Sequence, residues 1–140
     1  MFLFKKRKKD KEKEQKPPKG TVDYNARKIK KKYPVNEYGF FGEKGDNKQV
    51  IYSPKHVKDS KKFFKKISNG GKRKDSGNDY SIQKIMKDNG SVVYREKTST
   101  PNSPAVDLGD MKGKIKNQRI HFLKKEKLAN NKTKQERSRK

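Results

Sequence analysis

The chain has 140 residues and a formal net charge of +25, with 41% charged and 26% hydrophobic residues. So few apolar side chains cannot form a core over the whole length, and we expect one domain between solvated ends. The absence of cysteine excludes disulfides and thiolate zinc sites. The charge favours polyanionic partners, with nucleic acid ahead of an anionic membrane.

Both ends of the chain are rich in lysine and arginine. We predict disordered basic tails at residues 1–34 and 124–140, around an α+β domain at residues 35–123. The apolar stretch 1–4 is too short for a secretory signal, and no segment reaches transmembrane length. We therefore expect no signal peptide and no stable membrane insertion. A weak interfacial anchor beside the lysine run is the alternative.

The first half of this domain predicts a hairpin and then a helix. Residues 38–41 and 49–52 are aromatic or β-branched runs around a turn-rich spacer, a pattern typical of a hairpin. Ser53 and Pro54 supply a helix start, and Asn69-Gly70-Gly71 supplies a stop, so we predict a helix over 54–68. We expect the following aromatic residues to pack in the core, with base stacking as the alternative: Tyr38, Phe40, Phe41 and Tyr52.

The second half predicts an antiparallel meander. Asn89-Gly90 separates two β-prone runs, 80–86 and 91–95, which is a strong hairpin signal. Alternating apolar and polar residues predict two more strands, at 105–108 and 116–123. We therefore expect an α+β fold in which one main helix covers a small antiparallel sheet. The alternation directs these side chains to the core: Val106, Leu108, Ile120 and Phe122.

The same alternation brings ionisable residues to the open side of the sheet, namely Arg95, Asp107, Arg119 and His121. Such a set suits metal-free cleavage of RNA. Histidine can act as the base that removes the proton of the ribose 2′-OH or as the acid that protonates the leaving 5′-oxygen. Guanidinium groups stabilise the charged phosphorane. Asp107 is then expected to orient His121 or to act as its partner base. We expect the rim of this site to consist of Lys97, Thr98, Ser99 and Thr100.

Several alternatives stay open for these residues. The charged set also fits an ordinary cross-strand network with a surface histidine. His56, at the start of the predicted helix, is a candidate second acid or base. The sequence shows too few converging carboxylates and no histidine spacing for a metal site, so we expect no metal and no cofactor.

Six segments together carry a resemblance to a known family: 35–42, 50–53, 64–71, 88–95, 103–107 and 120–122. In these segments the chain resembles C-terminal toxin modules of Gram-positive polymorphic toxins, of the kind attached to LXG-type type VII secretion proteins. Two features depart from that pattern. We expect no delivery domain before Met1, and residues 108–111 replace a longer strand.

The resemblance implies a growth-inhibiting nuclease, in the group of barnase-like ribonucleases, with an acidic immunity protein as partner. It implies action in the cytoplasm of the producing or the target bacterial cell, with export as part of a larger effector. It also marks Arg95, Asp107 and His121 as positions to test. The alternatives are a non-catalytic basic protein that binds nucleic acid, and an inactive toxin cassette that binds its immunity protein.

Overall fold

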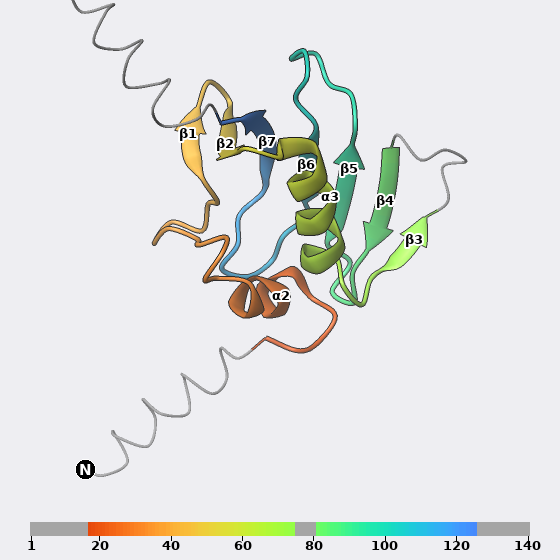
Figure 1. The fold of residues 1–140 in the computed structure, drawn as a ribbon. Coiled ribbons are helices and arrows are strands. Elements are labelled where there is room, and N and C mark those ends of the chain that lie inside the picture. Colours follow the sequence, from red (N-terminus) through yellow and green to blue (C-terminus); the bar gives the residue numbers. More distant parts are fainter. Residues whose placement is uncertain (1–16, 75–80, 126–140) are drawn as a thin grey trace, which may run out of the picture.

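A computed structural model describes residues 17–74 and 81–125 as an α+β fold with two helices and a seven-stranded sheet (Figure 1). The elements, in chain order, are α2 (Val22–Lys28), β1 (Glu43–Gly45), β2 (Lys48–Ser53), α3 (His56–Ile67), β3 (Lys72–Lys74), β4 (Ser81–Ile85), β5 (Ser91–Arg95), β6 (Ala105–Gly109) and β7 (Gln118–Lys124). Of the tails expected at 1–34 and 124–140, residues 1–16 and 126–140 lie outside the described residues, as does Tyr80 of the expected strand 80–86.

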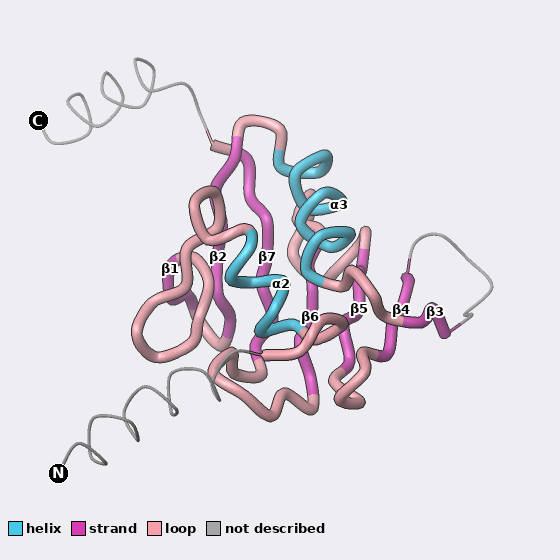
Figure 2. The backbone as a smooth tube through the Cα atoms, turned by 90° about the horizontal axis from the view of Figure 1, so that it is seen from below, coloured by secondary structure: helices cyan, strands magenta, loops and turns pink. Residues whose placement is uncertain are grey.

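The sheet has the strand order β1-β2-β7-β6-β5-β4-β3, which can be followed across Figures 1 and 2. The predicted antiparallel meander is present from β3 to β7, and β2 then pairs with β7 in parallel. The sheet is therefore larger than the small meander expected, and it is mixed. The parallel pair joins segments separated by more than sixty residues, and no local pattern indicates such a contact.

α3 lies across one face of the sheet (Figure 1) and supplies much of the core. The predicted helix is confirmed, although it begins at His56 and not at Pro54. Its Phe63 ring lies 5.6 Å from that of Phe122, and its Phe64 ring lies 5.6 Å from that of Tyr94, measured between centroids. The predicted inward set on β6 and β7 is buried against this helix, which confirms the facing of both strands: Val106, Leu108, Ile120 and Phe122.

The expected domain boundary at residue 35 is wrong, because residues assigned to the N-terminal tail belong to the core. α2 begins after Thr21, whose side chain accepts a hydrogen bond from the backbone N–H of Tyr24. The Asn25 amide donates to the backbone oxygens of Ile67 and Asn69, at 2.8 and 3.0 Å. The helix and the segment after it bury Val22, Ala26 and Tyr33 in the main hydrophobic cluster. At the other end, Lys124 extends β7 by one residue beyond the boundary expected at 123.

The first hairpin is present, but one of its strands is shifted along the sequence. β1 lies within the expected spacer, and residues 38–41 form no strand apart from one isolated bridge between Val35 and Phe41. Gly39 and Gly42 have φ values of +90° and +66°, a left-handed conformation that interrupts an extended strand. The aromatic residues also divide: Phe41 is fully buried, whereas Tyr38 and Tyr52 are 68% and 49% exposed, which contradicts their expected core packing.

Candidate functional site

Strand register gathers the predicted ionisable residues on the sheet face turned away from α3. We call this side the open face. Asp107 lies opposite Arg119, and Ala105 lies between Arg95 and His121 in one cross-strand row. The alternation of β2 places Lys48 on the same side, in the strand next to β7. The open face therefore holds the predicted Arg95, Asp107, Arg119 and His121.

A carboxylate between two guanidinium groups forms the centre of the open face. The Nε of Arg119 donates to Oδ1 of Asp107 at 2.7 Å, and the Nε of Arg95 donates to Oδ2 at 2.8 Å. The side chains of Arg95 and Arg119 remain 45% and 51% exposed. One negative charge thus orients two positive charges, and the cluster keeps an excess positive charge that faces solvent. We call these three residues the Arg-Asp-Arg cluster.

His121 is on the expected face but is buried, with 4% of its surface exposed. Its Nδ1 lies 2.8 Å from Oγ of Ser103, so Ser103 orients the ring. The expectation that Asp107 does so is not met: Nδ1 contacts Ser103, and Asp107 accepts hydrogen bonds from the arginines. Burial lowers the pKa of His121, Lys48 and Arg119 lower it further, and Asp107 opposes them. The imidazole is therefore neutral at pH 7.

The predicted rim residues form a loop between β5 and β6 that leads to the histidine. The hydroxyl of Thr98 donates to the backbone oxygen of Ser103 at 2.7 Å and accepts from the Thr100 N–H at 3.2 Å. Thr98 therefore organises this loop from within, whereas Lys97 and Ser99 are exposed and Thr100 is partly buried. The structure places all four at the end of the open face where Arg95 and His121 lie.

His56 is also attached to this loop. Its Nε2 lies 2.9 Å from the backbone oxygen of Asn102, and the side chain is 7% exposed. The two histidines thus contact neighbouring residues, Asn102 and Ser103, from different elements. Because His56 is bonded to a main-chain oxygen and His121 to a hydroxyl, neither ring bonds to the Arg-Asp-Arg cluster. His56 acts here as a structural residue of the loop.

A hollow of about 280 Å³ adjoins the Arg-Asp-Arg cluster. Its lining includes the cations Lys44, Lys48 and Arg119 and the aromatic side chain of Phe40. A cationic rim beside an aromatic ring suits a nucleotide, because the phosphate and the base are bound by different chemistry. Lys44 and Lys48 were not among the predicted site residues. The alternation of β2 puts Lys48 and Gln49 on different faces of the sheet. Lys48 comes beside Arg119 because β2 pairs in parallel with β7.

Ser103 is the other functional residue that the sequence analysis missed. It lies within the Ser103-Pro104-Ala105-Val106-Asp107 segment, and its side chain is 1% exposed. A serine immediately before a strand is an ordinary loop residue, so its identity gives no signal of a histidine partner. The contact joins residues that are 18 positions apart in the sequence.

Other groups with shifted pKa values lie in the core and not in a site. Burial, together with a smaller effect of the Asp59 charge, raises the pKa of Tyr33 to about 12. Burial also raises the pKa of Tyr94. Both phenols therefore stay protonated at neutral pH. Within residues 17–74 and 81–125, no three His, Asp or Glu side chains gather where they could hold a metal ion.

No protein-family model, no curated protein and no solved structure matches the chain. Of the helices in the described residues, none has both the length and the apolar character needed to cross a bilayer.

Proposed function

We propose that this protein binds RNA through the open face of its sheet. The observation that carries the proposal is the Arg-Asp-Arg cluster, in which Asp107 holds two arginines by their Nε atoms at 2.7 and 2.8 Å. Each arginine still has terminal N–H groups with which to bind phosphate oxygens. Because Asp107 fixes both side chains before the ligand arrives, less conformational entropy is lost on binding.

The surroundings of the cluster support a nucleotide as the ligand. Lys44 and Lys48 add positive charge beside Arg119, and Phe40 offers an aromatic surface in the same hollow. The net charge of +25 attracts any polyanion at long range, so the protein is expected to encounter nucleic acid readily at low salt. RNA is preferred over DNA in this proposal because of the resemblance to ribonuclease toxin modules.

Metal-independent cleavage of RNA is the second candidate, and the state of His121 favours it. The ring is neutral at pH 7, its Nδ1 is held by Ser103, and its Nε2 has no hydrogen-bond partner in the described part of the chain. A neutral imidazole can accept the proton of a ribose 2′-OH, whose oxygen then attacks phosphorus and expels the 5′-oxygen of the next nucleotide. Arg95 and Arg119 would bind the phosphorane oxygens.

Cleavage requires access that simple binding does not. Because His121 is 4% exposed and its Nδ1 contacts Ser103, the groups that surround the ring must move before RNA reaches it. Binding alone requires no such movement, since Arg95 and Arg119 are already exposed. For this reason binding is the first candidate and cleavage the second.

The biological setting that we propose is that of a toxin module, following the resemblance alone. Such a module would act in the cytoplasm of a bacterial cell, after export as part of a larger effector. An acidic immunity protein would neutralise it by covering cationic surface, for which the open face offers complementary charge. An inactive cassette would retain the immunity partner and lose the effect on RNA.

The two candidates are separated by one set of measurements on a fluorescent single-stranded RNA in EDTA. The double variant R95Q/R119Q is compared with K112Q/K114Q, which removes the same charge from the exposed β6–β7 loop. We expect the open-face variant to bind about tenfold more weakly at ~0.1 M salt, and the control much less so. Equal affinity of the two variants contradicts the proposed site.

The same samples test cleavage. If His121 acts as proposed, the wild type cuts RNA in EDTA, and both His121→Ala and a 2′-deoxy substitution at the cut position stop it. The modified RNA is the control for folding, because it leaves the protein unchanged. Binding without cutting in the wild type supports the first candidate alone.

A further inference from the structure

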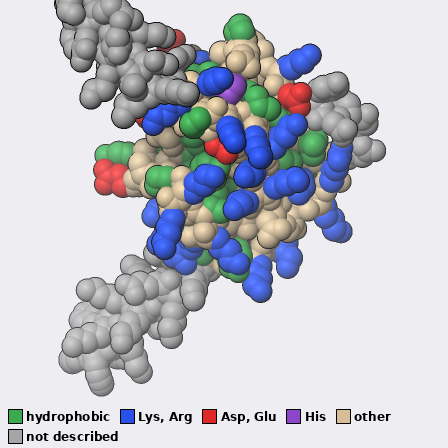
Figure 3. Space-filling view, in the orientation of Figure 1, with side chains coloured by type: hydrophobic (Ala, Val, Ile, Leu, Met, Phe, Trp, Pro, Cys, Tyr) green, Lys and Arg blue, Asp and Glu red, His purple; other side chains and the backbone are tan. Residues whose placement is uncertain are grey.

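The outer side of α3 is a row of lysines without carboxylates. The residues that the helix turns to solvent are Lys58, Lys61, Lys62, Lys65 and Lys66. Figure 3 shows Lys and Arg side chains gathered over α3 and over the strands beside it. We call these five residues the lysine row. It lies on the side of the sheet opposite to the open face, because α3 covers the other side.

The charge of the lysine row is largely uncompensated. Asp59 is the one acidic residue of α3, and its carboxylate accepts a hydrogen bond from the Ser53 hydroxyl at the edge of the helix. Asp59 is also 4.0 Å from Nζ of Lys32, and its side chain is 19% exposed. Within the described residues, the row makes one ion pair, between Lys61 and Glu96 at 3.8 Å. Lysines three and four residues apart repel each other, so this arrangement weakens the helix and a polyanion would relieve that repulsion.

A groove of about 340 Å³ runs between the lysine row and the sheet. Its floor is apolar, formed by Phe64, Tyr94 and Ile82, and the ring centroids of Phe64 and Tyr94 are 5.6 Å apart. Its rim is cationic and comes from three elements: Lys61 and Lys65 of α3, Arg73 of β3 and Lys84 of β4. The Nζ of Lys84 lies 5.6 Å from the centroid of the Phe64 ring. An apolar floor with a cationic rim can accommodate a flat base while cations bind the phosphates on either side of it.

We propose that the lysine row and this groove form a second RNA-binding surface, which holds the backbone of a single strand along α3 and one base in the groove. Side chains three and four residues apart on a helix are about 5–6 Å apart, so the row offers successive cations along one line. A strand of RNA presents successive charges in the same way, and its unpaired bases are free to enter a groove. The surface does not depend on the Arg-Asp-Arg cluster, although the choice of RNA as partner rests on the proposed function.

An acidic protein is the competing partner for a row of lysines. Carboxylates would satisfy the row, but they would leave the apolar floor of the groove uncovered. In this groove the cationic side chains of Lys61, Lys65 and Lys84 surround the apolar floor formed with Phe64 and Tyr94. A ligand that joins regular negative charge to flat aromatic rings matches both parts, and RNA is such a ligand.

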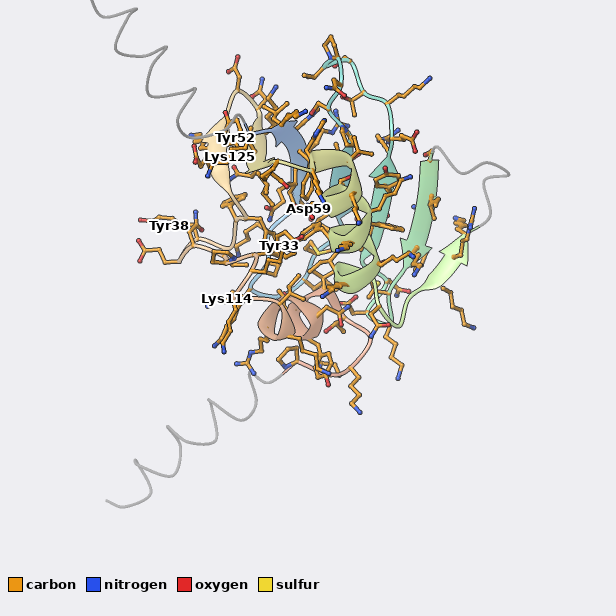
Figure 4. All side chains as sticks on the ribbon, viewed as in Figure 1. Tyr33, Tyr38, Tyr52, Asp59, Lys114 and Lys125 are labelled. Carbon is orange, nitrogen blue, oxygen red and sulfur yellow. The ribbon has the colours of Figure 1, made fainter. Side chains whose placement is uncertain are left out.

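The test uses the triple variant K61Q/K65Q/K84Q in the full chain. Its matched control, K112Q/K114Q/K116Q, removes three positive charges from the exposed β6–β7 loop. Lys114 lies beside α2 in Figure 4, and its backbone N–H donates to Asp23 of that helix. The control substitutions therefore change a loop next to α2 and none of the residues of the lysine row. All six side chains are exposed or partly exposed. We therefore expect both variants to fold, and circular dichroism is the check.

The probe is a fluorescent single-stranded RNA of about 20 nucleotides that contains one 4-thiouridine. We expect the triple variant to bind about tenfold more weakly at ~0.1 M salt, and the slope of log K against log salt to fall by about two, at ~0.7 for each phosphate contact with a single strand. Photo-crosslinks in the wild type are expected within residues 61–65 and 82–84. Equal losses in the two triple variants, or crosslinks confined to the open face, overturn the proposal.

Two further arms identify the partner and the site. Poly-L-glutamate of matched charge is expected to compete poorly with RNA, and equally strong competition would assign the surface to acidic proteins instead. The variant R95Q/R119Q reports on the open face separately. If R95Q/R119Q alone loses binding, the second surface is overturned and the proposed function stands. If K61Q/K65Q/K84Q alone loses binding, the open face is overturned as the binding site and the second surface stands.

Discussion

Asp107 determines how the charged residues of the open face are arranged. Without it, Arg95 of β5 and Arg119 of β7 would repel each other across β6, the strand between them. With it, both guanidinium groups are held by hydrogen bonds of 2.7 and 2.8 Å, and only one of their two charges is neutralised. His121, in contrast, is held by Ser103 in a separate and buried contact. At the scale of single residues, the open face therefore consists of an exposed cationic cluster beside a buried neutral imidazole.

Acid is expected to destabilise the fold through His121. Burial lowers the pKa of His121 in the folded protein below 6.5, the ordinary value for an imidazole. As the pH falls below 6.5, the unfolded chain takes up a proton that the folded chain does not, so the free energy of unfolding decreases. The contribution is fully present above pH 6.5 and is lost as the pH falls through the folded pKa.

Urea unfolding at about pH 7.5, 6.5 and 5.5 measures this effect. We expect the midpoint of the wild type to fall over this range by more than that of His121→Gln, which cannot titrate. A direct measurement is the ring titration of His121 by NMR. Identical pH dependence in the two proteins would show that His121 is not responsible.

At the scale of elements, α2 decides where the domain begins. Its side chains reach α3 and the β6–β7 loop: Asn25 bonds to the end of α3, and Asp23 accepts from the N–H groups of Lys114 and Ile115 at 2.7 and 3.0 Å. These bonds satisfy carbonyl and N–H groups that lie near the ends of other elements. The helix is seven residues long, too short to be stable by itself, so its contacts with the rest of the domain stabilise it.

Truncation tests the importance of α2. A chain that begins at residue 35 loses the buried side chains of Val22, Ala26 and Tyr33 and leaves the carbonyls of Ile67 and Asn69 without the Asn25 amide. We expect it to lose at least ~3 kcal/mol of stability, or to stay unfolded. A chain that begins at residue 17 keeps all of these groups and is expected to unfold at the same urea concentration as the full chain. Equal midpoints for the two truncated chains would exclude a role for α2 in the core.

At the scale of the whole molecule, two cationic surfaces lie on opposite sides of one sheet. The open face joins cations to a carboxylate, whereas the lysine row on α3 has little compensation. The core between them is thin, with one main helix on a single layer of strands (Figure 2). A protein of this kind can bind two segments of a long polyanion at the same time. Once one surface is bound, the other binds the same molecule at a high effective concentration, so the overall affinity rises.

If the two surfaces act independently, their effects on binding add. We expect the five-fold variant R95Q/R119Q/K61Q/K65Q/K84Q to lose the sum of the free energies that R95Q/R119Q and K61Q/K65Q/K84Q lose on a short RNA, within about 0.5 kcal/mol. Titrations of the four proteins at one salt concentration measure this. If the loss in the five-fold variant differs from that sum by much more than this, one surface influences the other, or both bind the same segment.

The periodicity of the sequence was sufficient for much of the architecture. The 91–95, 105–108 and 116–123 strands alternate strictly enough to reveal both faces, so the inward residues and the shared face of Arg95, Asp107, Arg119 and His121 were predictable. The β4–β5 hairpin followed from Asn89-Gly90, and Asn89 adopts a positive φ of 70° there. The first hairpin is predicted less well, because the aromatic run 38–41 includes Gly39, whose positive φ of 90° interrupts a strand.

The α+β class, the covering helix and the side of the sheet on which the charged residues lie were therefore predictable, because they depend on patterns that repeat every two to four residues. Three features follow from the packing of distant segments alone: β2 lies beside β7, α2 completes the core, and Ser103 contacts the ring of His121. Each of these depends on contacts between distant segments, such as the Asn25–Ile67 bond across 42 positions. Local periodicity does not show which distant segments pack together. Because burial depends on that packing, the burial of His121 could not be predicted from the sequence.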